Sequence, residues 1–275
     1  MRRGDHGLAW RVAAQARAGR DPATRDDPRL PYHLRWVWDG TDPARRHVLV
    51  RCYHGLGDTL QFARYIPELA RRAASVTVEA PPALVGLLAA LPCAVFPFDQ
   101  SSPAKPSEVD IEIMELSEAL QLEPDAAEPR WLEPNGFTLP PGTIGLCCRA
   151  GDWDAERSVP EALLAPLAAA HPCLSLDIGR SALPVLNPGG CPQDMAATAA
   201  LLAGCAVVVT VDTMIAHLAG ALGKPVLLLL RDAPDWRWVH ESGRSPWYPW
   251  FSLFPQPSPG AWEPVIAAVL QELQR

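Results

Sequence analysis

The sequence predicts an α/β protein made of two domains, each with a parallel β-sheet. Three observations lead to this fold class. Short apolar runs of strand length alternate with segments of helical periodicity along the chain. Between Pro124 and Pro141 a proline-rich and acidic stretch without periodicity interrupts this alternation, which then starts again. The chain has 275 residues, of which 48% are apolar, and this is enough to fill the cores of two domains.

The first half predicts an N-terminal domain over residues 46–140. Residues 1–45 are rich in arginine, aspartate and proline, and we expect an irregular lead-in with one short helix at 8–18. The apolar runs predict strands at 48–53, 75–79, 93–98 and 109–114, and the periodic segments predict helices at 59–73 and 83–90. Strands that alternate with helices favour a parallel sheet with helices on its faces.

The second half repeats this pattern and predicts a C-terminal domain over residues 141–275. Strands are expected at 143–148, 173–178, 206–211 and 225–230, and helices at 160–170, 194–203 and 213–222, with a last helix at the end of the chain. Four tryptophans in the tail 234–260 are expected to dock it onto the core, although they can also line a base or sugar pocket. Two Rossmann-like domains of this kind face a cleft, and ligands bind beyond the carboxyl ends of the strands.

Composition excludes several classes of function. The net charge is -7 without a lysine or arginine tract, so nucleic acid is not an expected partner. The seven cysteines form no CxxC pair and no zinc spacing, and this scattered pattern is typical of the reducing cytoplasm. No signal peptide and no apolar run long enough for a membrane span is found. We therefore expect a cytoplasmic protein without an integral membrane span.

A candidate phosphate site lies where the predicted strand 206–211 meets the next helix. Asp212 is placed to cap that helix, Thr213 begins it, and His217 follows one turn later on the same face. A hydroxyl, an imidazole and the free N–H groups of a helix N-terminus then converge where a diphosphate can bind. The alternative is a capped core helix that carries one hydrogen-bonded histidine.

A second candidate site follows the first strand, in the glycine-containing turn before a helix. Its glycines, Gly55 and Gly57, allow a close backbone approach, but the third glycine of a dinucleotide fingerprint is missing. Asp58 is a carboxylate at this turn that can act as general base on an acceptor hydroxyl, and a plain helix cap is the alternative. His54 and Gln61, on either side, are further candidates for the acceptor side.

A third candidate is the loop after the first strand of the second half. Arg157 and Ser158 precede a helix that starts with proline, and both can reach a phosphate. Asp152 and Asp154 resemble the Asp-x-Asp metal motif of other sugar transferases, but a solvated loop has the same pattern, and we expect no metal ion. Lys224 is followed by proline and does not belong to a Walker A loop.

Taken together, these segments resemble a known family. They are Trp38-Asp-Gly, HGLGDTLQFARYIP, RSVP, VDTMIAHLAGALGKPV and APDWRW…SPWYPW…LF, in this order up to the C-terminus. The set is similar to the glycosyltransferase domain attached to bacterial tetratricopeptide-repeat proteins, a group related to the ADP-heptose heptosyltransferases. The resemblance implies the GT-B fold, with the acceptor on the N-terminal half and the nucleotide sugar on the C-terminal half.

The resemblance also implies roles for single residues. Asp58 matches the carboxylate proposed as base, Asp212, Thr213 and His217 match the donor motif, and Arg157 matches the basic residue near the diphosphate. Three departures stand out: Met214 replaces a glycine of the heptosyltransferases and can change how closely the donor phosphates approach the backbone, the loop 150–156 lacks the asparagines common in the repeat-linked group, and no tetratricopeptide array precedes the domain.

These inferences predict a hexosyl- or heptosyltransferase-like enzyme. It would move a sugar from a nucleotide-diphosphate sugar to a hydroxyl of a glycan, lipid-linked or protein acceptor, with inversion and without a metal ion or other cofactor. Two alternatives stay open. The chain can be a nucleotide-sugar-binding or scaffold domain without turnover, or another nucleotide-sugar enzyme of the same fold such as an epimerase.

Overall fold

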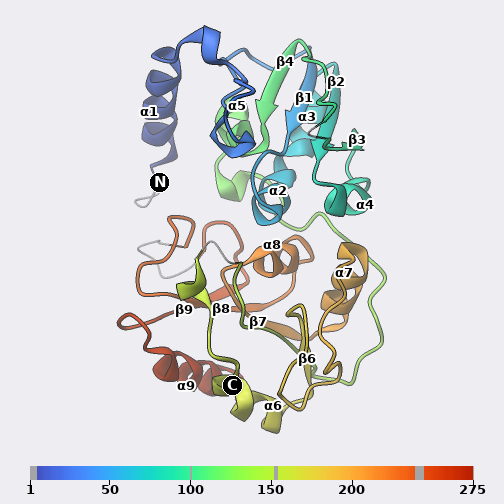
Figure 1. Cartoon of the computed structure of the whole chain (residues 1–275), viewed down its shortest axis with the longest axis vertical. Helices are drawn as coiled ribbons and strands as arrows, with labels where there is room; N and C mark the ends of the chain where they lie inside the picture. Colours follow the sequence, from blue (N-terminus) through green and yellow to red (C-terminus); the bar gives the residue numbers. More distant parts are fainter. Residues whose placement is uncertain (1–4, 100, 152–153, 239–244, 275) are drawn as a thin grey trace. The chain divides into compact units, whose positions relative to one another are not determined.

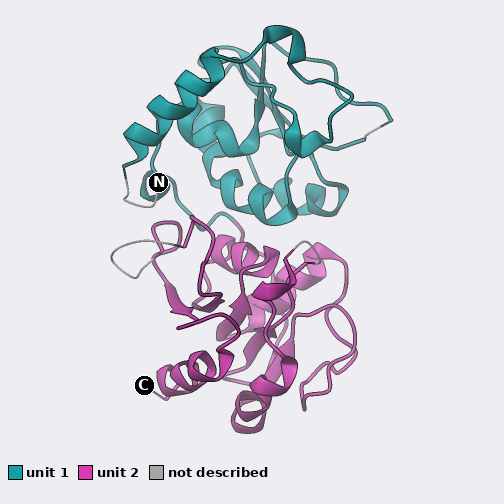
Figure 2. Ribbon diagram, turned by 60° about the vertical axis from the view of Figure 1, so that its left-hand side comes forward, with its two compact units in different colours: residues 1, 3–131 teal, residues 2, 132–275 magenta. Residues whose placement is uncertain are grey.

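The chain folds into two compact α/β units, which divide between Trp131 and Leu132 (Figures 1 and 2). This computed structural model describes residues 5–99, 101–151, 154–238 and 245–274. Each unit has its own parallel sheet with helices packed on it, and the predicted fold class is thereby confirmed. The division falls within the proline-rich segment that interrupts the sequence pattern.

The sheet of unit 1 has the strand order β3-β2-β1-β4, and every neighbouring pair is parallel. The four strands are β1 (His47–Arg51), β2 (Ser75–Ala80), β3 (Ala94–Pro97) and β4 (Val109–Glu112). Arg51 pairs in register with Glu79 on one side and with Glu112 on the other. The carboxyl ends of β1 and β4 therefore lie side by side, although residues 52–108 separate the two strands in the sequence.

The helices of unit 1 are short. They are α1 (His6–Ala18), α2 (Leu56–Phe62), α3 (Ile66–Arg72), α4 (Val85–Leu88) and α5 (Leu116–Leu120), with 3₁₀ turns at Pro22–Thr24, Tyr32–Leu34, Ala63–Tyr65, Pro82–Leu84, Ile113–Glu115 and Pro124–Ala126. The prediction of one helix over 59–73 is wrong. Two α-helices stand there, joined by the 3₁₀ turn, because Pro67 has no N–H to continue the α-helical hydrogen bonds.

The described part of the predicted lead-in, residues 5–45, belongs to unit 1. Val37 and Trp38 are core residues, at 1% and 4% exposure. Arg17 of α1 lies over the Trp38 ring at 4.1 Å and forms an ion pair of 2.5 Å with Glu118 of α5. Stacking and charge together hold α1 on the unit.

A buried ionic group crosses the sheet of unit 1. Arg51 of β1 is 1% exposed and lies 3.1 Å from Glu79 of β2 and 3.2 Å from Asp110 of β4. Arg51 and Glu79 also bind the loop before β4. Glu79 accepts a hydrogen bond from the Ala104 N–H, and Arg51 donates one to the Ala104 carbonyl. The group thus connects three neighbouring strands and one loop.

The sheet of unit 2 has the order β6-β5-β7-β8-β9 and is also parallel throughout. Its strands are β5 (Ile144–Cys147), β6 (Cys173–Ser175), β7 (Val207–Val211), β8 (Val226–Leu230) and β9 (Phe251–Pro255). The edge strand β9 lies in the tryptophan-rich tail, where the sequence pattern predicts no strand. Prolines on both sides of its short apolar run hide it, and an edge position tolerates them.

Both faces of the unit 2 sheet are covered by helices. These are α6 (Ala165–Ala170), α7 (Met195–Gly204), α8 (Met214–Ala221) and α9 (Trp262–Glu272), with 3₁₀ turns at Ala155–Arg157 and Glu161–Leu164. Val209 and Val211 of β7 belong to the core that Leu167 of α6 and Val265 of α9 complete, while α7 and α8 pack against each other (Figure 1). Within the described ranges, none of the helices combines the length and the apolar character needed to cross a bilayer.

Candidate functional site

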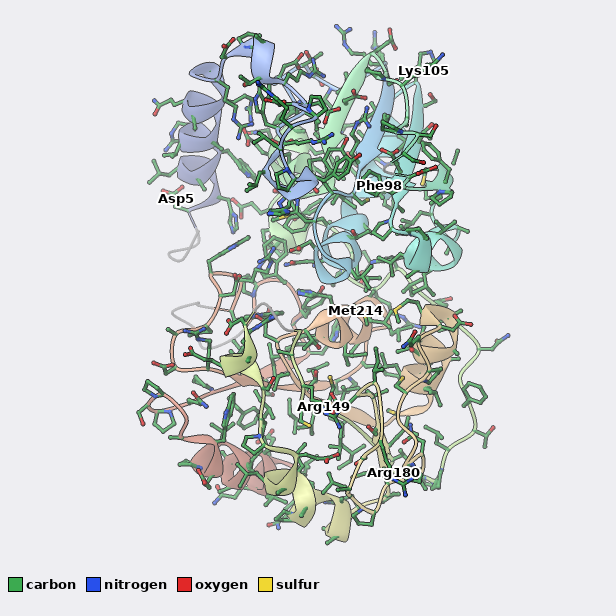
Figure 3. All side chains as sticks on the ribbon, in the orientation of Figure 1. Asp5, Phe98, Lys105, Arg149, Arg180 and Met214 are labelled. Carbon is green, nitrogen blue, oxygen red and sulfur yellow. The ribbon has the colours of Figure 1, made fainter. Side chains whose placement is uncertain are left out.

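The candidate donor site of unit 2 is centred on the step from β7 to α8. Thr213 is the N-cap of α8, in an extended conformation, and its Oγ1 accepts a hydrogen bond of 3.2 Å from the Ile215 N–H. The prediction that Asp212 caps this helix is therefore wrong. An extended threonine places its own hydroxyl against the first turn, so the cap lies one residue later. Met214, labelled in Figure 3, is the first helical residue.

Asp212 lies between the end of β7 and this cap, and Arg157 is its partner. Arg157 Nη1 donates a hydrogen bond of 2.7 Å to the Asp212 carbonyl and lies 3.9 Å from its carboxylate. Burial raises the pKa of Asp212, while the nearby Trp238 indole N–H and the charge of Arg157 lower it in part. The structure thus brings together Arg157, Asp212 and Thr213, three of the residues that the sequence assigns to the donor site.

The loop that carries Arg157 is held by polar contacts of its own. Asp154 Oδ2 lies 3.5 Å from Arg157 Nε and 3.0 Å from Arg231 Nη1, so one carboxylate faces two guanidinium groups. Ser158 Oγ accepts a hydrogen bond of 2.9 Å from the Ala150 N–H. The predicted site residue Ser158 therefore fixes the two ends of this loop to each other.

The Asp-x-Asp pattern can be placed only in part, since Asp152 lies outside the described residues. Its second carboxylate, Asp154, makes the arginine contacts given above. In the part of the chain that the structure describes, no group of three or more His, Cys, Asp or Glu side chains is arranged to hold a metal ion.

His217 lies inside the unit at 5% exposure, against the aromatic tail. Its Nδ1 is 3.0 Å from the Tyr248 hydroxyl, and its ring stacks on Trp238 with centroids 5.5 Å apart. Tyr248 in turn packs on Gly220 of α8, where an added Cβ would lie 2.2 Å from the phenol ring. The structure therefore places the imidazole among buried aromatic side chains, whereas Thr213 and Arg157 are only half-buried.

Asp177 belongs to this region, although sequence reasoning does not single it out. It follows β6 and accepts hydrogen bonds from the N–H groups of Cys148 at 3.0 Å and Arg149 at 2.9 Å. Burial, and then the charge of Asp177, raises the pKa of the Cys147 thiol well above its usual range, so the thiol stays neutral. Through its hydrogen bonds to the N–H groups of Cys148 and Arg149, Asp177 fixes the start of the loop that ends at Arg157. The one feature of the sequence that could have indicated Asp177 is its position as a single acidic residue at the carboxyl end of a predicted strand.

The candidate acceptor site of unit 1 is the turn between β1 and α2. Gly55 is the N-cap of α2, and Asp58, the third helical residue, reaches back so that Oδ2 accepts a hydrogen bond of 3.2 Å from the Gly55 N–H. Gly57 lies in the same first turn, and Asp58 is half-buried. Gln61 lies further along α2 and is buried, at 0% exposure. The other candidates, His54, Gly55, Gly57 and Asp58, lie at the turn itself.

Glu112 at the end of β4 approaches this turn, and Glu115 of the following 3₁₀ turn contacts Glu112. Glu112 Oε1 lies 3.0 Å from Nδ1 of His54, and Glu115 accepts a hydrogen bond of 3.4 Å from the Glu112 N–H. Burial, followed by the nearby Glu112 charge, raises the pKa of Glu115 to about 7. Neither glutamate is a sequence candidate, because only the pairing of β1 with β4 brings them to this turn.

Comparisons with known proteins agree with the fold and match one segment of unit 2 to a family. Residues 191–242 match glycosyltransferase family 9 (heptosyltransferase), and this segment contains the whole step from β7 to α8. No curated protein matches the chain.

Three solved structures are similar to the chain over most of its length. The glycosyl transferase family 9 protein of Veillonella parvula DSM 2008 is 10% identical, with 78% of this chain and 87% of that chain covered and a TM-score of 0.58. The E. coli heptosyltransferase WaaC with ADP is 14% identical, with 83% and 97% covered and a TM-score of 0.56. The iron-containing dodecameric glycosyltransferase TibC of enterotoxigenic E. coli H10407 is 12% identical, with 81% and 66% covered and a TM-score of 0.57.

At these identities the structural likeness defines the fold, which is the GT-B fold of the heptosyltransferases. The family match adds the segment that carries Asp212, Thr213 and His217. The tetratricopeptide-linked group, in contrast, is not among these relatives. The chain thus has the GT-B fold, and its residues 191–242 are similar to glycosyltransferase family 9, the heptosyltransferase family.

Proposed function

We propose that this chain transfers a sugar from a nucleotide-diphosphate sugar to an acceptor hydroxyl, with inversion and without a metal ion. The observation that carries the proposal is the bond from Arg157 to the Asp212 carbonyl. It holds a guanidinium beside the N-terminus of α8, inside the region matched by the family. A guanidinium and a helix N-terminus both bind phosphate oxygens.

In this proposal the donor diphosphate binds at the start of α8. The N–H groups of the first turn and the Thr213 hydroxyl donate hydrogen bonds to its oxygens, and Arg157 offsets the negative charge that develops as the nucleotide departs. Met214 stands where the chain turns into the helix and sets how closely the phosphates approach the backbone. His217, held by Tyr248, supports this turn from inside the unit.

Asp58 is the proposed general base. The acceptor oxygen bonds to the anomeric carbon from the side opposite the diphosphate, while its proton passes to Asp58 and the electron pair of the broken bond leaves with the nucleotide. One displacement inverts the configuration at the anomeric carbon. The Gly55 N–H holds one carboxylate oxygen of Asp58, so the side chain is oriented before the acceptor binds.

The remaining partners are proposals of the same kind. The acceptor is a glycan, a lipid-linked sugar or a protein hydroxyl, and nucleic acid is not expected because the net charge is negative. All seven cysteines are free thiols, which is compatible with work in the reducing cytoplasm. One solved structure of similar fold, TibC, is described as iron-containing, so the test below includes a chelator.

Thermal unfolding with a panel of UDP-, GDP-, ADP- and CMP-sugars tests this function. A ligand that binds only the folded chain raises the unfolding temperature, so one class of nucleotide should stand out. Turnover with that donor should persist in a chelator, and NMR of the product should show the inverted anomer. If no nucleotide sugar binds, the proposal fails. Binding without turnover favours the scaffold alternative, and consumption of the donor into an isomer favours an epimerase.

Asp58→Ala is the matching variant for the base. It should abolish transfer and leave donor binding nearly unchanged, because the donor contacts belong to unit 2. An Asp58→Ala chain that keeps wild-type turnover would remove Asp58 from the mechanism.

A further inference from the structure

A second titratable group, His54, belongs to the same turn as Asp58 in unit 1, and the mechanism above does not use it. His54 Nδ1 lies 3.0 Å from Glu112 Oε1, with 32% of the imidazole side chain exposed and only 5% of the glutamate. A buried carboxylate thus faces an imidazole that reaches the surface of the turn. The two atoms lie within ion-pair distance, although their geometry is not that of a hydrogen bond.

Glu112 is held firmly on its own side. It is the last residue of β4, in register with Arg51 of β1, and its Oε2 accepts a hydrogen bond of 2.7 Å from the Met114 N–H. The other oxygen, Oε1, is the one that faces His54. A carboxylate beside Nδ1 favours the tautomer that carries its proton there, and the lone pair is then on Nε2.

His54 and Asp58 belong to one turn. Asp58 Oδ2 binds the N–H of Gly55, the residue that directly follows His54. An imidazole is a stronger base than a carboxylate, so a histidine in this turn is a chemically suitable second acceptor for a proton that is released there.

We propose that His54, positioned by Glu112, is a second proton acceptor beside Asp58, an inference that rests on the proposed function. As the acceptor oxygen bonds to the anomeric carbon and the bond to the diphosphate breaks, the proton passes to Asp58 and on to Nε2 of His54. The electron pair leaves with the nucleotide, so no further reactant is needed. Glu112 touches no substrate and acts as a positioning residue.

Several titratable groups near His54 and Glu112 contribute to the dependence of turnover on pH. Glu112 of β4 faces the imidazole directly, Asp58 of α2 shares its turn, and Glu115 of the following 3₁₀ turn lies next to Glu112. Arg20 lies 3.9 Å from Glu115. Burial, followed by the nearby Glu112 charge, raises the pKa of Glu115 to about 7, so Glu115 also titrates in the range that the pH profile covers.

Turnover of the donor selected by the panel, measured against pH, tests the proposal in the full chain. His54→Gln should lower kcat on the order of 100-fold, with the KM for the donor changed less than twofold, since it removes a proton acceptor and no donor contact. Glu112→Gln should lower kcat on the order of 10-fold and move the acidic limb to lower pH, because the carboxylate no longer stabilises the charged imidazole. His33→Gln, at an exposed histidine of the same unit, should match the wild type.

A His54→Gln chain that keeps the wild-type kcat and acidic limb would overturn the proposal, even if Asp58→Ala abolishes transfer. A wild-type chain that turns over no donor would instead contradict the proposed function. NMR of the histidine ring protons needs no donor. The His54 titration midpoint should fall by at least half a pH unit in Glu112→Gln, and equal midpoints in the two proteins would contradict the positioning role of Glu112.

Discussion

At the scale of single residues, Arg157 is the clearest test of the donor site. Arg157→Gln removes the cation next to the Asp212 carbonyl and should weaken binding of the nucleoside diphosphate roughly 10- to 100-fold, since hydrogen bonds to charged groups contribute about 1.5–3 kcal/mol. Titration calorimetry with the diphosphate alone measures this loss. Arg29→Gln removes the same charge from an exposed pair in unit 1 and serves as control. Equal affinities in all three proteins would contradict the proposed contact.

Glu115 makes the stability of the chain depend on pH. Its pKa is about 7 when folded and near the ordinary 4.5 when unfolded, so the folded chain holds more protons between these values. Stability therefore falls as the pH rises through this window. Glu115→Gln cannot ionise and should lose less stability between about pH 5 and pH 8, by about 1–3 kcal/mol, because the side chain is 23% exposed and partly screened. Denaturant unfolding at the two pH values measures the difference, and parallel curves would contradict it.

At the scale of elements, variants of the helix caps distinguish an effect on stability from an effect on diphosphate binding. Thr213→Val keeps the shape but removes the hydroxyl that accepts from Ile215, at a cost of about 1 kcal/mol in stability. It should also weaken binding of the diphosphate. Asp194→Ala removes the corresponding cap of α7, where the carboxylate accepts from the Ala196 N–H, and should cost as much stability without any change in affinity. If both variants bind alike, Thr213 is only a cap.

The packing of α8 on the aromatic tail predicts a strong effect at one glycine. Gly220→Ala places a methyl group 2.2 Å from the Tyr248 ring, so the phenol must move away from His217 as well. Overpacking of this kind costs about 1–3 kcal/mol. Gly86→Ala in α4 meets no atom within 4 Å and should be neutral or slightly stabilising. Thermal unfolding of both variants checks the contrast, which would disappear if the tail were loosely packed.

The pattern of apolar residues in the sequence predicts the buried strands well. Every predicted strand forms, because a parallel sheet covered on both faces needs continuous apolar runs. The exceptions have physical reasons. Pro67 divides a periodic segment into two helices, and β9 is bounded by prolines that a central strand would not tolerate.

At the scale of the whole molecule, the two-domain organisation follows from the sequence, whereas the order of the strands does not. Glu112 comes to His54 only because β1 pairs with β4 on one side and with β2 on the other. Likewise Tyr248 reaches His217 only when the tail folds back onto α8. The sequence thus predicts site residues that follow strands within one motif, such as Thr213 and Asp58. Partners that arrive from distant segments need the tertiary structure.

Strand β8 is apolar at all five positions and is fully buried, and its outer neighbour β9 begins only at Phe251. During synthesis the ribosome releases β8 some twenty residues before the segment that covers its edge. In that interval the strand presents unpaired N–H and C=O groups beside leucine side chains, the pattern that recruits other chains into aggregates. A nascent chain stalled or cleaved before Phe251 should therefore depend on chaperones and collect in the insoluble fraction.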